Sequence, residues 1–291
     1  MSEKRPRVLG IGELLWDMLP TGRQLGGAPA NFAYHCARQG CDAAIVSSVG
    51  DDELGRDAIA QLRAKGVDAH LIATVPDLPT GQVDVTLDAD GQPEYDIRRN
   101  VAWDRLPWNE YLFSELYGYD AMCYGTLAGR TPENINTLDK ILTLGYHAML
   151  VFDVNLRPPH VERDAITAGL MRATVVKLNS VEAKDLASML GLVEDNPRRL
   201  FDALTTRAHR LTTLIITDGA AGSRVIDREE GESYVASPTV AVVDTVGAGD
   251  AFTATFVTAR LQGDSIEEAH QRAAHVAAAV CSEPGAMPDI Y

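Results

Sequence analysis

Residues 240–261 read VAVVDTVGAGDAFTATFVTARL, a stretch in which a glycine turn joins an apolar run to a long helix-like segment. Asp244 ends the apolar run, Gly247 and Gly249 form the turn, and Asp250 begins the helix-like segment. A glycine turn that opens a helix leaves backbone N–H groups without partners, and such groups bind anions well. Asp250 lies among these groups, although a carboxylate repels anions. Its presence is explained if Asp250 is a base that takes a proton from a substrate hydroxyl while the turn holds a phosphoryl group.

The composition is that of a globular enzyme with an acidic surface. The 291 residues suffice for one large core, and 46% of them are hydrophobic. A net charge of −15 argues against nucleic acid and anionic membranes as partners, because both attract basic surfaces. The four cysteines form no CxxC pair, so we expect no zinc site and a reducing compartment. The sequence contains no apolar leader and no long apolar run, and we expect a cytoplasmic location.

The hydrophobic pattern alternates short apolar runs with helix-like segments. The chain opens with the strand-like RVLGIG, a helix from GGAPAN to Gly40, the strand-like DAAIVSSVG and a helix that ends at Gly66. This β–α–β–α order is typical of a parallel sheet covered by helices. Further strands are expected at 120–125, 148–153, 174–178, 213–217 and 223–227, and helices at 132–145, 181–190, 196–209, 248–262 and 266–281.

One insertion breaks the α/β rhythm. Residues 70–104 contain the alternating segment TGQVDVTLDADGQPEYDI, in which Asp90-Gly91 is a hairpin signal. Together with residues 12–25, this segment could form a small sheet that acts as a lid, or an edge hairpin without a role. The apolar Val83, Val85 and Leu87 on such a sheet could pair with a second copy, and we expect a homodimer.

Polar residues follow several of the expected strands, where ligands bind in open α/β sheets. In GGAPAN, the Gly26-Gly27 pair lets a ligand approach the backbone, and Asn31 can both donate and accept hydrogen bonds. Such a turn is structural more often than not when it stands alone. Asp17 could accept hydrogen bonds from sugar hydroxyls, or it could be a solvated hairpin acid.

The segment DVNLRP begins directly after an apolar run. In an extended chain its Asp153, Asn155 and Arg157 would point the same way. Arg157 could then clamp a carboxylate or a phosphate, and a structural salt bridge is an equal alternative.

Two further segments follow expected strands. In NSVE, Asn179 and Glu182 could supply oxygen ligands for Mg²⁺, directly or through water, or they could simply cap a helix. The glycine loop TDGAAGS, residues 217–223, could flank a ligand or form a tight hairpin.

Three motifs together identify a family. The chain has no GxxxxGK[ST] loop and no protein-kinase signature. Over nearly its whole length, GGAPAN, NSVE and DTVGAGDAF in this order closely resemble the PfkB/ribokinase family of carbohydrate kinases, and GELLWDMLP and IRRNVAWDRL are most similar to bacterial fructokinases. The resemblance implies a single ribokinase-like three-layer α/β/α domain over 1–291, with a mainly parallel sheet and a small β lid formed from about 12–25 and 70–104.

The resemblance also implies a set of site residues. The catalytic residues would be the base Asp250, the anion hole Gly247, Ala248 and Gly249, and Arg157. The sugar-binding residues would be Asp17, Gly26, Gly27, Asn31 and Arg98. The residues for ATP would be Asn179, Glu182, Thr217, Gly219, Gly222, Ala278 and Cys281. Glu182 would hold Mg²⁺ through water, and Asp244 resembles a K⁺ ligand in members that use that ion.

The expected activity is transfer of the γ-phosphate of ATP to the primary hydroxyl of a small sugar, with D-fructose as the leading substrate. The first alternative substrate is the sugar acid 2-keto-3-deoxygluconate, which is compatible with Arg98, Arg99 and Arg157. Ribose or a nucleoside is the next alternative. A non-catalytic sugar- or nucleotide-binding protein on the same scaffold is the remaining alternative. The intact Asp250 and glycine turn argue against it, because a binding protein needs no base.

Overall fold

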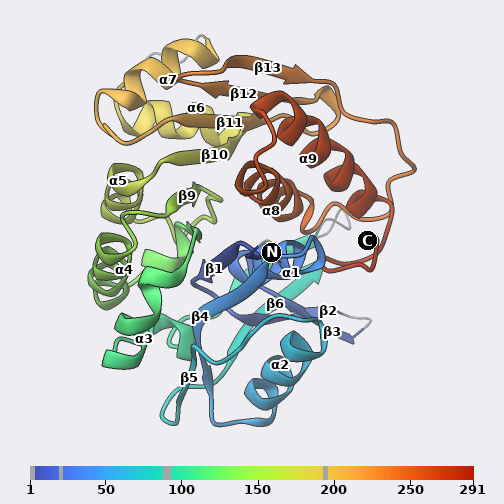
Figure 1. Cartoon of the computed structure of the whole chain (residues 1–291). Coiled ribbons are helices and arrows are strands. Elements are labelled where there is room, and N and C mark those ends of the chain that lie inside the picture. The colour runs from blue at the N-terminus through green and yellow to red at the C-terminus, as the bar shows by residue number, and fades with distance from the viewer. Residues whose placement is uncertain (1–3, 20–21, 88–92, 193–195) are drawn as a thin grey trace.

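The computed structural model describes residues 4–19, 22–87, 93–192 and 196–291, and it contains two sheets (Figure 1). The larger sheet has nine strands in the order β13-β12-β11-β10-β9-β8-β1-β4-β5. All its pairs are parallel except β11 with β12 and β12 with β13, as expected from the β–α alternation. Its strands are β1 (Arg7–Ile11), β4 (Asp42–Gly50), β5 (Ile72–Val75), β8 (Ala121–Gly125), β9 (Met149–Asp153), β10 (Val175–Asn179), β11 (Thr213–Thr217), β12 (Ser223–Asp227) and β13 (Gly231–Val235).

Helices cover both faces of this sheet, which gives the predicted three layers. Successive strand residues point into opposite cores. Val8 belongs to the core that contains side chains of α1, α2, α8 and α9, and Leu9 to the core that contains side chains of α3 to α7. The helices are α1 (Ala28–Arg38), α2 (Glu53–Ala64), α3 (Glu110–Glu115), α4 (Pro132–Leu144), α5 (Arg163–Arg172), α6 (Ser180–Met189), α7 (Pro197–Thr205), α8 (Ala248–Leu261) and α9 (Ile266–Cys281).

The smaller sheet has four strands in the order β3-β2-β6-β7 and its own small core. Its strands are β2 (Leu15–Leu19), β3 (Gly22–Gly26), β6 (Gly81–Leu87) and β7 (Pro93–Ile97). The expected lid boundary is wrong at one place, because Ile72–Val75 pairs with β4 in the large sheet. Val83 is buried in the small core and lies on an inner strand, so it offers no free edge. The expected turn at Asp90-Gly91 lies outside the described residues.

The helices α3 and α5 and the strand β13 were not expected from the sequence. α5 has no side-chain cap at its start, and its Gly169 lies directly over the ring of Phe152. Contact with the sheet, and not local propensity, therefore stabilises α5. Within the part of the chain that the structure describes, no helix is long and apolar enough to cross a bilayer.

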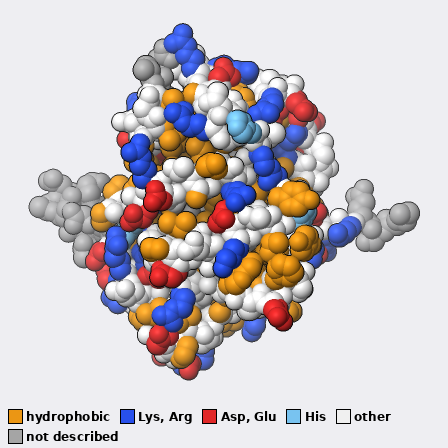
Figure 2. All heavy atoms as spheres, turned by 90° about the vertical axis from the view of Figure 1, so that its left-hand side faces the viewer, with side chains coloured by type: hydrophobic (Ala, Val, Ile, Leu, Met, Phe, Trp, Pro, Cys, Tyr) orange, Lys and Arg blue, Asp and Glu red, His pale blue; other side chains and the backbone are white. Residues whose placement is uncertain are grey.

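The face over α3, α4 and α5 mixes hydrophobic, acidic and basic side chains (Figure 2). Several aromatic residues are exposed, and some contact one another, as Tyr117 does with Phe113 and His147. The exposed aromatic residues are Trp108, Tyr111, Phe113, Tyr117, Tyr146, Tyr234 and Tyr291.

Candidate active site

The predicted site residues come together from distant parts of the chain. Asn31, in the first turn of α1, donates its Nδ2–H to Oδ2 of Asp250 in the first turn of α8, at 2.7 Å. The two residues are 219 positions apart, and both helices pack on the same face of the large sheet. The GGAPAN and DTVGAGDAF motifs therefore form one site.

Asp250 is held in an environment that favours its neutral form more than water does. Burial, together with the charge of the nearby Asp153, raises the pKa of Asp250 to about 6. The hydrogen bond from Asn31 and the charges of Lys177 and Arg157 act in the opposite direction. A carboxylate with this pKa is ionised at neutral pH and is basic enough to accept a proton from a positioned hydroxyl.

The glycine turn before α8 has the conformation that an anion hole requires. Gly247 has a φ of 77°, in the left-handed region that disfavours side chains, and a Cβ there would lie 2.6 Å from Cα of Ala286. No acceptor for the N–H groups of Gly247 and Gly249 occurs among the described residues. The N–H of Ala248, the third expected donor of the hole, lies 3.4 Å from the carbonyl oxygen of Thr245, and the N–H of the preceding Val246 donates to Asp244 at 3.0 Å.

A buried ion pair lies beneath the first turn of α8. Nζ of Lys177 is 3.1 Å from both carboxylate oxygens of Asp153, and the hydroxyl of Thr253 donates to the same acid at 3.0 Å. Burial lowers the pKa of Lys177, but the charges of Asp153, Glu182 and Asp250 outweigh this effect and raise it. Nζ is also 3.0 Å from the position that a Cβ on Gly249 would take. The ammonium group therefore lies directly behind the glycine turn.

Two more acids with raised pKa values lie at the start of the small sheet, and the charge of Asp250 acts on the first of them, Glu13. Burial raises the pKa of Glu13 to about 7, and its Oε1 accepts the N–H of Ala28 while its Oε2 has no hydrogen-bond partner among the described residues. Burial raises the pKa of Asp17 to about 6, an effect that the charge of Arg157 reduces. A Cβ on Gly26 would lie 2.5 Å from Oδ2 of Asp17. The Gly26-Gly27 turn therefore leaves room for the carboxylate of Asp17.

The two arginines expected at the site differ in their surroundings. Arg157 is exposed, and its guanidinium donates to the carbonyl of Leu156 at 3.2 Å. Asn155 has a φ of 40°, so this segment is not extended and the expected common direction of Asp153 and Arg157 is wrong. Arg98 forms a bidentate pair with Asp84 on the small sheet, at 2.6 and 2.7 Å, and would have to leave it to bind a substrate.

Asn179 and Glu182 form a reciprocal cap at the start of α6. Oδ1 of Asn179 accepts the N–H of Val181 and of Glu182, and Oε2 of Glu182 accepts the N–H of Asn179. The other oxygen of Glu182 accepts the N–H of Leu156, at 2.8 Å. Both carboxylate oxygens keep a second lone pair, so Glu182 fits a water on Mg²⁺ better than direct coordination. The described residues contain no group of three acids, histidines or cysteines that could hold a metal.

The residues expected to flank ATP lie at the ends of β11 and α9. Thr217 ends β11, next to Asn179 in the sheet, and Gly219 and Gly222 have φ values of 50° and 120°. Ala278 is half-buried on α9, and the carbonyl of Cys281 accepts the N–H of Val243 at 2.8 Å.

The backbone of Val243 therefore contacts the C-terminal end of α9, and the side chains of Val242 and Val243 are 65% and 63% exposed. These two residues were not among the expected site residues. The sequence signal for Val242 and Val243 was the apolar run at residues 240–243, which does not form a strand in the structure.

Asp244 joins two loops of the site. Its Oδ1 accepts the N–H of Val246, and its Oδ2 accepts the N–H of Gly285, both at 3.0 Å. The residues that sequence reasoning missed include Lys177, Thr253 and Glu13. The signal for Lys177 was a lone lysine within an apolar strand, which requires a buried partner.

Comparisons with known proteins agree with this geometry. The family model "pfkB family carbohydrate kinase" matches residues 20–290. Fructokinase-1 of Oryza sativa subsp. japonica is 31% identical over 100% of this chain and 96% of its own, and a fructokinase of Klebsiella pneumoniae is 31% identical over 84% and 81%. A structure of fructokinase with bound ATP from Xylella fastidiosa superposes with a TM-score of 0.83 at 24% identity, covering 97% of this chain and 94% of that one. The chain belongs to the pfkB family of carbohydrate kinases and is an ATP-dependent sugar kinase.

Proposed function

We propose that this kinase transfers the γ-phosphate of ATP to the primary hydroxyl of D-fructose, giving fructose 6-phosphate. The observation that carries the proposal is the position of Asp250, which stands beside unpaired N–H groups and is oriented by Asn31. The choice of sugar rests on relatives from plants and a bacterium that are named fructokinases.

In the proposed mechanism, Asp250 removes the proton of the sugar hydroxyl as its oxygen attacks the γ-phosphorus. The bond from that phosphorus to the bridging oxygen breaks, and ADP leaves with the bond electrons. The N–H groups of Gly247 and Gly249 stabilise the charge on the transferring group, with Ala248 between them in the turn. Arg157 is exposed at the edge of this site and can turn toward the phosphates without breaking an ion pair to any described residue.

The remaining site residues position the two substrates. The sugar lies between Asp17 and Asn31, where Gly26 and Gly27 keep the backbone clear of side chains. ATP lies along Thr217, Gly219 and Gly222, with its adenine near Ala278, Cys281 and the exposed Val242 and Val243. Mg²⁺ would enter with ATP, contact Glu182 through water, and neutralise phosphate charge.

Three finer assignments belong to the same proposal. A K⁺ ion beside Asp244 would lie next to the loop at Gly285, which Asp244 already contacts. The small sheet would act as the lid and as the contact of a homodimer, through its edge strands β3 and β7. The cytoplasm is the proposed compartment, as expected from the unpaired cysteines.

A second candidate substrate is 2-keto-3-deoxygluconate. The exposed guanidinium of Arg157 favours it, because it forms no salt bridge among the described residues and could bind a carboxylate. Arg98 supports it less, because its Nε and Nη2 already donate to the carboxylate of Asp84.

The test is Mg·ATP-dependent ADP release with fructose, 2-keto-3-deoxygluconate, ribose, glucose, adenosine and fructose 6-phosphate. We expect the highest kcat/KM with fructose. Preference for the keto-acid would move the substrate assignment and leave the base unchanged. No turnover with any of these sugars would contradict the proposed substrate class.

A further inference from the structure

His35 is a fully buried histidine outside the reacting groups, and both of its ring nitrogens have partners. Nε2 lies 2.9 Å from the carbonyl oxygen of Ala286, and Nδ1 lies 2.8 Å from the hydroxyl oxygen of Tyr291. A buried imidazole with two defined contacts at 0% exposure is held in one orientation.

The contacts also fix the tautomer of His35. A carbonyl oxygen only accepts, so Nε2 must carry the hydrogen that it donates to Ala286. Burial lowers the pKa of His35 to about 4, so the ring is neutral at physiological pH. Nδ1 is then an acceptor, and the hydroxyl of Tyr291 donates to it. Tyr291 therefore selects the tautomer that binds Ala286.

Ala286 is the residue against which the glycine turn packs. A Cβ on Gly247 would lie 2.6 Å from Cα and 2.8 Å from the carbonyl oxygen of Ala286, so the two backbones are in direct contact. Neither can shift alone, because Ala286 is 7% exposed and closely surrounded. The position of the Ala286 carbonyl therefore sets the position of the Gly247 N–H group.

One face of α1 contacts both the base and this turn. Asn31 and His35 are four positions apart, so they lie on the same side of the helix. Asn31 binds Asp250, and His35 binds Ala286 behind Gly247. One turn further on, Gln39 donates to Thr255 of α8 at 3.0 Å. α1 thus fixes the base and the anion hole relative to each other.

We propose that His35 and Tyr291 are positioning residues, which hold the Gly247–Gly249 anion hole at the distance from Asp250 that phosphoryl transfer requires. This inference rests on the proposed function for the roles of Asp250 and the hole.

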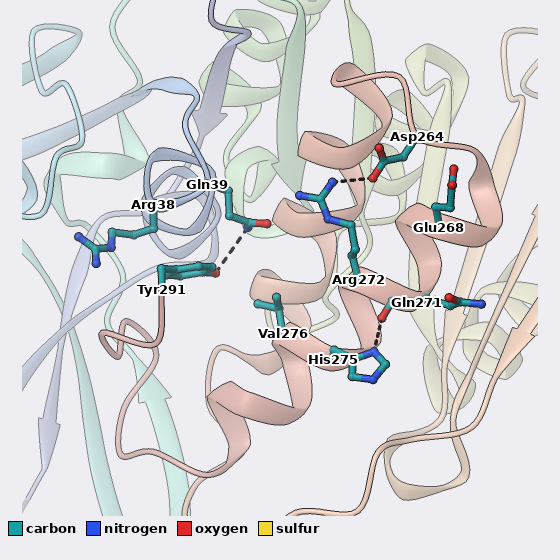
Figure 3. Close-up of a pocket in the computed structure, with 9 residues that line it drawn as sticks. All are labelled: Arg38, Gln39, Asp264, Glu268, Gln271, Arg272, His275, Val276 and Tyr291. Atoms are coloured by element: carbon teal, nitrogen blue, oxygen red, sulfur yellow. Dashed lines mark hydrogen bonds and ion pairs between the residues drawn. The ribbon is translucent and has the colours of Figure 1, made fainter.

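The outer end of this arrangement reaches the surface. Tyr291 is 40% exposed and borders an open hollow of about 770 Å³ against α9 (Figure 3). The side chain of Gln39 lies beside Tyr291 there, with its amide nitrogen 3.5 Å from the hydroxyl (Figure 3). Tyr291→Phe therefore keeps the ring at this position and removes only the hydroxyl that donates to Nδ1 of His35.

The chain offers a matched control in Tyr34. Its hydroxyl donates to the carbonyl of Pro288 at 2.7 Å, so Tyr34→Phe also removes a hydroxyl that joins α1 to the C-terminal segment. The substitution keeps the aromatic ring and both hydrogen bonds of His35. We expect Tyr291→Phe to lower kcat on the order of tenfold, since a misplacement near 1 Å costs up to about 100-fold. KM for ATP and sugar should stay within about twofold, and Tyr34→Phe should keep kcat.

Two variants of His35 separate positioning from packing. His35→Leu removes both hydrogen bonds and should lower kcat at least as much as Tyr291→Phe. His35→Gln can place its amide N–H where Nε2 donates to Ala286, and it should recover most of the activity. Equal kcat in Tyr291→Phe and Tyr34→Phe, at equal thermal stability, would overturn the proposal.

Hydrogen–deuterium exchange gives a readout that does not depend on the sugar. The peptide covering residues 244–252 should exchange faster in Tyr291→Phe than in wild type or in Tyr34→Phe. Unchanged exchange in Tyr291→Phe would contradict the positioning role even if the enzyme phosphorylates fructose. Faster exchange in an enzyme that is silent with every sugar would keep the positioning role and contradict the proposed substrate instead.

Discussion

Replacing Lys177 by methionine tests the buried charge arrangement under the active site. The side chains of Lys177 and Asp153 are 8% and 5% exposed, and two contacts of 3.1 Å join them. Methionine fills a similar volume but leaves the carboxylate of Asp153 with the hydroxyl of Thr253 as its remaining partner. Removing one member of a buried pair costs about 3–5 kcal/mol of folding free energy. At about 2–4 °C per kcal/mol, the melting temperature should fall by about 10 °C.

The same variant should change the pH dependence of catalysis. The charge of Lys177 lowers the pKa of Asp250, and that of Asp153 raises it. The base must be ionised, so kcat/KM of the wild type should fall below about pH 6. Lys177→Met should move this acid limb to higher pH, and Asp153→Asn should move it to lower pH.

The assay combines thermal unfolding with kcat/KM from pH 4.5 to 8 for both single variants and the double variant. The double variant removes both charges, so it should be more stable than Lys177→Met alone. The reasoning is refuted if Lys177→Met melts with the wild type, or if the acid limbs of the two single variants move in the same direction.

Three further substitutions have defined outcomes. Gly247→Ala places a Cβ against Ala286 at a φ of 77°, so kcat should fall more than tenfold with a lower melting temperature, and wild-type kcat would contradict the packing argument. Burial raises the pKa of Glu13 from 4.5 to about 7, so its contribution to stability is present at low pH and is lost as the pH rises through about 7. The free energy of unfolding of Glu13→Gln, measured in urea, should therefore rise relative to that of the wild type by up to about 3 kcal/mol between pH 5 and pH 8. A difference in unfolding free energy that stays constant over this pH range would contradict this expectation. Asn31→Leu removes the hydrogen bond that lowers the pKa of Asp250, so its acid limb should lie above that of the wild type in a kcat/KM profile, and an unmoved limb would argue against the contact.

Local sequence signals were sufficient for the alternation of strands and helices and for the glycine turns. Positive φ at Gly247 and the start of α8 follow from the residues themselves, because a glycine turn before an apolar helical run has few alternatives. Sequence reasoning also placed Asp250 and Asn31 in one site through the family resemblance, and the structure shows them in contact.

Contacts that depend on register or on distant segments were not accessible in this way. Lys177 meets Asp153 because β9 and β10 pair in one particular register. His35 meets Tyr291 across 256 positions, and nothing in either local sequence indicates the other. The left-handed Asn155 turns Arg157 away from the direction that an extended chain would give it.

The central claim is that Asp250 is the base, and Asp250→Ala tests it most directly. Two quantities are to be measured in the same preparation: kcat with fructose, and the Kd of Mg·ATP by calorimetry. The account predicts that kcat falls by at least about 10²-fold, the lower range for general-base catalysis, while the Kd changes little. A variant that keeps more than about a tenth of wild-type kcat would contradict the role of Asp250.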